Sequence, residues 1–287
     1  MTRFLAGLLV AVLAAAAAAI GTRYGLAWPT EHAAVAGLAA GLAVSVMFAA
    51  LSVRWSAAGT QSSILMTVFL AGASLMSLEM ASFRLSEPVF GSDIAVWGSL
   101  ISVFLGGLAV GAMAGGRLAD WRPGLAKLGI VLVAGGAVTL IIPFCYKAVF
   151  DWTFPGEGAP LPAEWGTGGG GSADGTLNVY VPPDLRWPAL LAGTILFGIP
   201  AILLGMASPY AARLFVHELQ HMGGGVGQVY GISTVGSIVG TLGTAFYLVS
   251  WIGTRRLLEA NGMLLVALGI ALAIAAALRR QTPETHA

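Results

Sequence analysis

Charged residues are scarce in this sequence, and their scarcity sets the class of protein. They make up 9% of the 287 residues, whereas a soluble domain typically carries about 25%. Hydrophobic residues make up 57%, and the mean hydropathy is +0.85. The net charge of +1 comes without a basic block, so no nucleic-acid partner is expected. We therefore expect an integral membrane protein whose surroundings are the lipid bilayer.

Cysteine is also nearly absent. The single Cys145 excludes an intramolecular disulfide and any site with several thiolate ligands, and we expect it to pack as a small apolar residue. No cofactor site is expected either. The glycine run at 168–171 lacks the Lys-Ser/Thr pair of a phosphate loop, and the glycine-rich stretch at 223–231 follows no strand.

Long apolar runs, in contrast, are abundant. A helix needs about 20 apolar residues to cross the hydrocarbon core, and unpaired backbone groups are costly in lipid, so these runs are expected to be helices. The predicted fold class is all-α integral membrane, with about eight transmembrane helices near 4–21, 32–53, 63–84, 94–115, 125–149, 189–215, 226–251 and 256–278. The first run imitates a signal peptide, but we interpret it as a helix.

The predicted organisation has two parts. Residues 1–60 hold two leading transmembrane helices, and residues 61–287 form a six-helix bundle with one long loop at 150–188. Arg117, Arg122 and Lys127 favour the cytoplasm for the connection between the fourth and fifth helices. Three arginines oppose this orientation. The prediction is a multi-pass protein of a bacterial inner membrane, with both termini cytoplasmic and the long loop external.

Glycines recur every four residues in two of the predicted helices. Gly107, Gly111 and Gly115 lie on one stripe of the fourth helix, and Gly236 and Gly240 lie on one stripe of the seventh. Residues four apart share a helix face, and a face without side chains lets a neighbouring helix approach closely. These glycines predict tight helix packing rather than chemistry. A stripe next to the second set carries hydroxyl side chains, at Ser233, Ser237 and Thr241.

Two prolines predict a kink or break in the sixth helix. Pro200 and Pro209 lie in its interior, with Gly198 and Gly205 close by. Each proline removes one internal hydrogen bond and pushes back the carbonyl one turn earlier. Transporters use such breaks to bind substrates at mid-depth, but a plain packing kink explains the pattern equally well.

The third helix carries the most polar residues at membrane depth. Glu79 lies well inside the apolar run, where a charge is costly by at least about 2.5 kcal/mol. It should therefore face the bundle, either protonated or beside a cation. Arg84 lies five residues on, so it is poorly placed for Glu79 on the same helix, and a residue from another helix or a cationic ligand fits as well. Asp93 ends an acidic turn at the mouth of this helix. Glu79, Arg84 and Asp93 are the candidates for binding a substrate or an ion.

The sequence His217-Glu218-Leu219-Gln220-His221 has the H-E-x-x-H spacing of a zinc peptidase. On a helix, two imidazoles four residues apart can hold one zinc ion while the glutamate activates water. A catalytic zinc also needs a third protein ligand, and His32 and His286 are not natural choices. We interpret the motif as a polar helix end. An intramembrane zinc metallopeptidase and adventitious metal binding at His217 and His221 remain alternatives.

Three stretches together resemble a known membrane domain. They are "SLEMASFRLSEPVFGSDIAVWGSLISVFLGGLAVGAMAGGRLAD", "FGIPAILLGMASPYAARL" and "GQVYGISTVGSIVGTLGTAFYLVSWIGTRRLL". In order and spacing they resemble the membrane domain of spermidine-synthase-like proteins, which are described as fused major-facilitator/spermidine synthase proteins. The resemblance spans most of residues 70–260. It implies that the last six helices form a major-facilitator-like half.

The resemblance also implies roles for individual residues. Glu79 and Arg84 match a recurring acid and base of the family. The turn at Gly116–Asp120 is similar to the G-x-x-x-D loop of a major-facilitator half, although Trp121 stands where that loop has arginine. Family members commonly continue into a soluble aminopropyltransferase-like domain. This chain contains no strand and glycine-rich helix of that kind, so we expect it to make no polyamine alone.

These inferences lead to two main hypotheses of function. The chain is an integral-membrane module of a spermidine-synthase-like system, which either anchors a separately encoded soluble or membrane partner or handles a small cationic substrate. Alternatively, it is a small secondary transporter that uses Glu79, with two six-helix halves forming a homodimer. No catalytic residue is assigned, because neither hypothesis gives this chain a catalytic activity of its own.

Overall fold

The computed structural model describes residues 57–121, 123–153, 186–217 and 222–281. Three predicted features therefore lie outside the described residues: the leading helices at 4–21 and 32–53, nearly all of the loop at 150–188, and the segment 218–221, which holds four of the five residues of the H-E-x-x-H motif. The described segments are helical and contain no strand.

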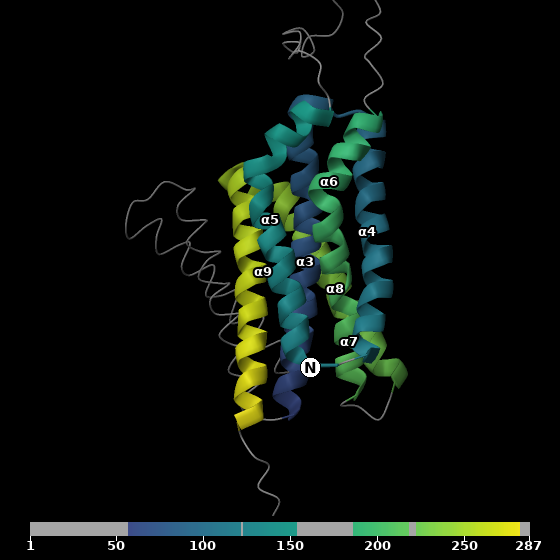
Figure 1. Ribbon diagram of the computed structural model, residues 1–287, viewed down its shortest axis with the longest axis vertical. Helices are drawn as coiled ribbons and strands as arrows, with labels where there is room; N and C mark the ends of the chain where they lie inside the picture. Colours follow the sequence, from purple (N-terminus) through teal and green to yellow (C-terminus); the bar gives the residue numbers. More distant parts are fainter. Residues whose placement is uncertain (1–56, 122, 154–185, 218–221, 282–287) are drawn as a thin grey trace, which may run out of the picture.

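Eight helical elements follow one another in the described part, and Figure 1 labels most of them. In chain order they are α3 (Ala57–Phe90), α4 (Ile94–Trp121), α5 (Leu125–Thr153), α6 (Arg186–Gly205), α7 (Ala207–His217), α8 (Met222–Gly243), the π-helix η1 (Thr244–Leu248) and α9 (Val249–Gln281).

Five helical stretches of the described part are long and apolar enough to cross a membrane, which is the mark of a multi-pass membrane protein. The last one, Gly223–Ala277, has 55 residues. At 1.5 Å per residue it would be about 80 Å long, more than twice the hydrocarbon thickness. Gly253 interrupts it with φ 74° and ψ 157°, a left-handed conformation that glycine adopts without strain. The stretch therefore bends at Gly253 and has two helical parts, one made of α8, η1 and the start of α9 and the other of the rest of α9.

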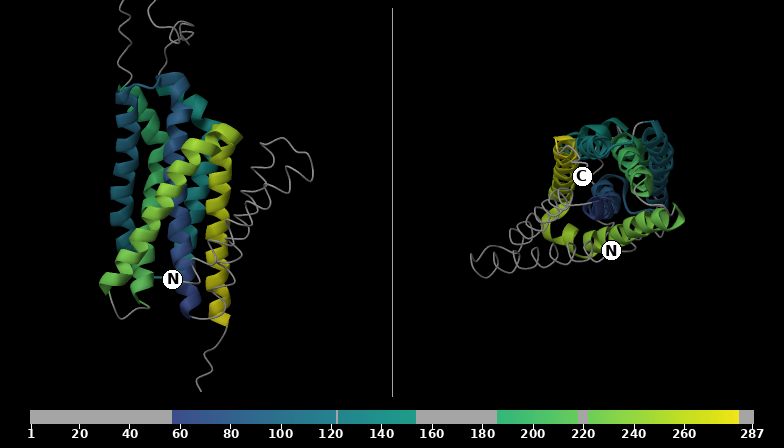
Figure 2. Two further views of the ribbon diagram at one scale, coloured as in Figure 1. Left: turned by 180° about the vertical axis from the view of Figure 1, so that it is seen from behind. Right: turned by 90° about the horizontal axis from the view of Figure 1, so that it is seen from below.

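Helix α3 occupies the middle of the bundle. Viewed along the helix axes, the other helices surround it (Figure 2), and it contacts α4, α6, α7, α8, η1 and α9. Its most apolar window is 72% buried, whereas that of α4 is 33% buried. On average, residues of this part of α3 are therefore more sheltered from lipid than those of the other described spans.

Three helix pairs make the most extensive contacts: α3 with α8, α4 with α6, and α5 with α9. Helices α3 and α8 run parallel, because Gly236 lies against Phe69 and Gly240 against Ala73. Helices α4 and α6 are also parallel, whereas α5 and α9 are antiparallel. The helices form two triplets in chain order, α3, α4 and α5, then α6, α8 and α9. Exchanging α3 with α6, α4 with α8 and α5 with α9 gives the same three pairs again.

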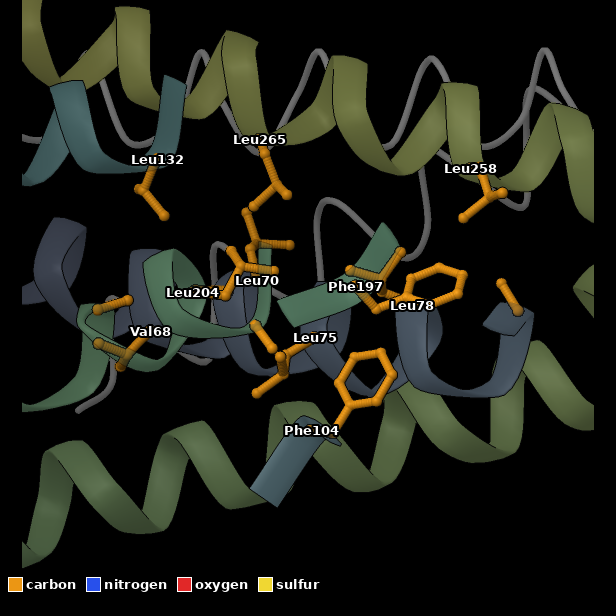
Figure 3. Packing of buried hydrophobic residues seen from close by; sticks show 14 of the residues in the cluster. Val68, Leu70, Leu75, Leu78, Phe104, Leu132, Phe197, Leu204, Leu258 and Leu265 are labelled. Atoms are coloured by element: carbon orange, nitrogen blue, oxygen red, sulfur yellow. The ribbon is translucent and has the colours of Figure 1, made fainter. Parts of the chain in front are cut away.

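A single apolar core surrounds α3. Figure 3 shows leucine, valine and phenylalanine side chains from several helices meeting there, including Leu75 and Leu78 of α3, Phe104 of α4 and Phe197 of α6. The rings of Phe104 and Phe197 lie 5.9 Å apart. Because lipid is as apolar as these side chains, close packing rather than escape from water holds such helices together.

Helices α4 and α5 are longer than the apolar runs predicted for them. The run at 94–115 belongs to α4, which continues to Trp121 and carries Arg117 and Asp120 in its last turns. The run at 125–149 belongs to α5, which ends at Thr153. Hydropathy detects the part of a helix that suits the hydrocarbon core, and the extra turns carry the polar residues of the membrane surface.

Candidate functional site

The sixth predicted crossing is distorted at one residue, Met206, although helical bonding continues through it, since the Tyr210 amide donates to the Met206 carbonyl at 3.2 Å. Helix α6 ends at Gly205 and α7 begins at Ala207, so Met206 belongs to neither. The Met206 amide donates a bifurcated hydrogen bond to the carbonyls of Ile202 (3.1 Å) and Leu203 (3.3 Å). Pro209 has no N–H, so the Gly205 carbonyl loses the donor that a continuous helix would give it. Pro200, in contrast, lies within α6, which continues through it.

Glycines of α4 allow the α4 backbone to lie close to the backbone around Met206. A Cβ atom added to Gly115 would lie 2.6 Å from the carbonyl oxygen of Met206, and one added to Gly111 would lie 3.0 Å from the Gly205 Cα. At Gly107 an added Cβ would overlap Ala201. The stripe predicted to pack tightly thus lies directly on the interrupted span.

A cavity of about 360 Å³ opens beside the break, among α3, α4, α6, α7 and α8. Its volume falls within the usual range for small-molecule pockets. Side chains such as Leu75, Met76, Leu108 and Leu204 form the larger, apolar part of its wall. None of the described residues that line it is charged.

Hydroxyl groups form the polar part of the cavity wall, mainly from α8. The hydroxyls of Ser208 and Ser233 lie 3.0 Å apart and share a hydrogen bond. Ser237 donates to the backbone carbonyls of Gly72 (3.3 Å) and Ser233 (3.1 Å). Gly72 makes this approach possible, because an added Cβ there would overlap the Ser233 carbonyl oxygen.

Glu79 lies one turn beyond the cavity on the same stripe of α3. It follows Leu75 by four residues and Met76 by three, and both of these line the cavity. The side chain is only partly buried. Among the described residues, no side chain forms a hydrogen bond or ion pair with its carboxylate, while its backbone carbonyl accepts a 2.6 Å bond from Ser82.

The other two candidate ligands lie apart from Glu79. Arg84 forms a 2.9 Å ion pair with Glu87, and both side chains are about half exposed. Asp93 precedes α4 and accepts a 3.0 Å hydrogen bond from the Ala95 amide, which is the role of a helix cap. The sequence grouped Glu79, Arg84 and Asp93, and of these only Glu79 falls on the stripe of α3 that lines the cavity.

The zinc motif falls mostly outside the described residues. The backbone of His217 ends α7, while Glu218 and His221 are not described. Within the described ranges, no three His, Cys, Asp or Glu side chains gather where a metal ion could bind.

Sequence reasoning missed a set of buried polar contacts around α3. Thr244 donates to the Ser77 hydroxyl at 2.8 Å, and the amide of Asn261 donates to the Ser74 carbonyl at 2.8 Å. An asparagine within an apolar run is a recognisable signal, because polar groups in a membrane helix usually bond to a neighbouring helix. The cavity hydroxyls carried no such signal, since serine and threonine also serve as small packing residues.

Two polar contacts join α7 to the C-terminal end of α4 and to the connection between α4 and α5. Arg213 pairs with Asp120 at 2.9 Å, and the Tyr210 hydroxyl donates to the Gly124 carbonyl at 3.2 Å.

Comparison with known proteins finds no match to this chain among family models, curated proteins or solved structures.

Proposed function

We propose that the chain is an integral-membrane module of a spermidine-synthase-like system that handles a small cationic substrate inside the bundle. One observation carries the proposal: the interrupted span lines a cavity, and Glu79 lies one turn away on the cavity stripe of the central helix. The cavity offers room for an aliphatic body, and the carboxylate offers the charge that a cation needs.

The position of Glu79 supports a role in binding. Acids at membrane depth usually face a bundle interior or an aqueous path and mark the routes of substrates and ions. Two other described glutamates have protein partners: Glu87 pairs with Arg84, and Glu259 pairs with Arg255 at 3.2 Å. Glu79 has no such partner among the described residues, so a cationic ligand would complete its surroundings.

The resemblance to spermidine-synthase-like proteins names the substrate class and the partner. It suggests a polyamine as substrate and a soluble aminopropyltransferase-like protein as partner. The distribution of lysine and arginine in the loops favours a bacterial inner membrane with both termini in the cytoplasm. The scheme of helix pairs supports the major-facilitator-like half, because such halves consist of two inverted three-helix repeats. Exchange of the two triplets of crossings preserves the pairs α3·α8, α4·α6 and α5·α9.

Direct binding tests this proposal. Labelled spermidine is titrated against the detergent-purified protein, and the Glu79→Gln variant is expected to bind at least about tenfold more weakly, since it loses a charge in a site of low dielectric. Glu87→Gln is the matched control, because Glu87 is exposed and already paired. No spermidine binding by the wild-type protein, or equal losses in both variants, would refute the proposed substrate role.

The partner is tested separately. Gentle purification from native membranes should bring down an aminopropyltransferase-like protein in stoichiometric amount. If a soluble partner never accompanies the chain while Glu79-dependent binding persists, the module handles substrate without that protein.

A secondary transporter is the second candidate, and the interrupted α6–α7 span favours it, because transporters place substrate at such breaks. Uptake of labelled spermidine into proteoliposomes distinguishes the two functions. A transporter accumulates label in a Glu79-dependent way, whereas a presenting module binds label without moving it. Pro209→Ala restores an N–H opposite the Gly205 carbonyl and should slow uptake more than it weakens binding.

A further inference from the structure

Most hydroxyl groups that line the cavity already donate their protons in hydrogen bonds within the protein. Ser237 directs its single proton to the carbonyls of Gly72 and Ser233. Thr234 donates its proton to the Tyr230 carbonyl at 2.9 Å. A hydroxyl has one proton but two lone pairs. Both residues line the cavity, so the oxygens of Ser237 and Thr234 have only lone pairs left to offer a ligand there.

The break adds a further acceptor. Gly205 lines the cavity, and its carbonyl has no helical donor because Pro209 lacks an N–H. On the donor side, the Ser208 and Ser233 hydroxyls share one bond and so leave one proton, and the Tyr230 hydroxyl can either donate or accept. The lining is thus richer in acceptors than in donors, and it includes no cationic side chain.

We propose that this cavity recognises an unsubstituted primary ammonium group through its N–H bonds, with Ser237 Oγ, Thr234 Oγ1 and the Gly205 carbonyl as acceptors. The apolar wall accommodates the aliphatic chain attached to that group. The inference rests on the proposed function, and it specifies the head group: the N–H bonds, and not the positive charge alone, determine which cation binds.

Other head groups fit this lining poorly. A trimethylammonium group has no N–H, and sites for such groups are usually built from several aromatic rings, whereas Tyr230 is the one aromatic residue among the described residues that line this cavity. A carboxylate or phosphate would face acceptor oxygens without a cationic partner, so its desolvation would not be offset.

Two probes of equal charge and equal chain length test the inference. Pentylammonium and pentyltrimethylammonium compete with labelled spermidine for the purified wild-type protein. Pentylammonium is expected to compete at least about tenfold more strongly, because it alone donates hydrogen bonds. Pentanoate, which carries the opposite charge, is expected not to compete.

Variants that keep side-chain shape identify the acceptors. Thr234→Val replaces the hydroxyl by a methyl group and should weaken pentylammonium binding about tenfold, while binding of pentyltrimethylammonium stays the same. Ser237→Ala should act in the same direction. Thr194→Val is the control, because Thr194 makes the same bond within its own helix, to the Leu190 carbonyl at 2.7 Å, and does not line the cavity.

The outcomes separate this inference from the proposed function. If both probes compete equally while Glu79→Gln still abolishes binding, charge alone selects the ligand and the inference is wrong. If Thr234→Val and Thr194→Val have the same effect, the assigned acceptors are wrong. If neither spermidine nor either ammonium probe binds the wild-type protein, the proposed function and the inference both fail.

Discussion

Helices α4 and α8 each have two glycine-bearing faces, and the two faces meet different surroundings. On the inner faces, an added Cβ would approach backbone atoms of a neighbouring helix to 3.2 Å or less, as at Gly107, Gly111, Gly115, Gly236 and Gly240. On the outer faces, an added Cβ would meet nothing within 4 Å, as at Gly98, Gly106, Gly227 and Gly231. Both faces have glycines four or eight residues apart.

This difference teaches that spacing alone does not identify a packed glycine. The inner glycine stripes form close helix–helix contacts, because α6 lies directly on the stripe of α4 and α3 lies directly on that of α8. The outer glycines keep the same period but have no described neighbour at contact distance. Small residues permit close approach, and only the partner helix determines whether it occurs.

The largest expected effect comes from placing a side chain on each face of α8. Gly240→Leu would put a Cβ 2.7 Å from the Ala73 Cα, where backbone cannot yield, and should lower the free energy of unfolding by about 3 kcal/mol or more. Gly231→Leu enters open space and should change stability by less than about 1 kcal/mol. Thermal unfolding in detergent, followed by tryptophan fluorescence, measures both. Equal losses would abolish the distinction between the faces.

The buried polar contacts extend the comparison from backbone to side chains. Asn261 is 6% exposed and bonds to the Ser74 carbonyl, so Asn261→Ala should lower the free energy of unfolding by about 1 to 2 kcal/mol. Ser102 lies on the exposed side of α4 and bonds only within its own helix, to Gly98. Ser102→Ala should therefore change stability by less than about 0.5 kcal/mol. A costlier Ser102 variant would contradict this ordering.

A smaller effect is expected where a hydroxyl pair joins α3 to η1. Thr244→Val removes the 2.8 Å bond to Ser77 and should lower the free energy of unfolding by about 0.6 kcal/mol, the usual value for such pairs in membranes. A double-mutant cycle with Ser77→Ala isolates this coupling. The same cycle with Thr241→Val, whose bond goes to Ser237 of its own helix, should give no coupling.

The smallest effect belongs to an ion pair at the bundle end. The side chains of Arg213 and Asp120 are 46% and 71% exposed, so water and salt weaken their attraction. Asp120→Asn should lower the free energy of unfolding by less than about 0.5 kcal/mol, and the loss should shrink further at high ionic strength. A larger, salt-independent loss would mean that this pair contributes as the inner-face contacts do.

Much of the helical layout follows from the sequence. The apolar runs predicted at 94–115 and 125–149 begin where α4 and α5 begin, because charge and hydropathy mark the membrane surface. The interruption at Met206 lies near Pro209, as the missing N–H suggests. Its position at one residue could not be predicted, since it also depends on Gly115 of α4 lying against Met206.

The candidate site is less visible in the sequence. Glu79 can be recognised because a carboxylate inside an apolar run is costly. The acceptor character of the cavity cannot, because it depends on which oxygen receives each hydroxyl proton. Ser237 meets Gly72 across 165 residues of chain, and Ser208 meets Ser233 across 25. Only the packing of α8 on α3 and α7 brings these groups together.

The interruption at Met206 also divides one crossing into two rods with separate attachments. Helix α6 follows the glycine face of α4, while α7 is tied to the α4–α5 connection through Tyr210 and Gly124 and to α4 through Arg213 and Asp120. The two rods meet at a single residue beside the cavity. Each of the two helices therefore holds its share of the cavity wall through its own contacts, Leu204 and Gly205 through α4, and Ser208 and Pro209 also through the connection that follows α4.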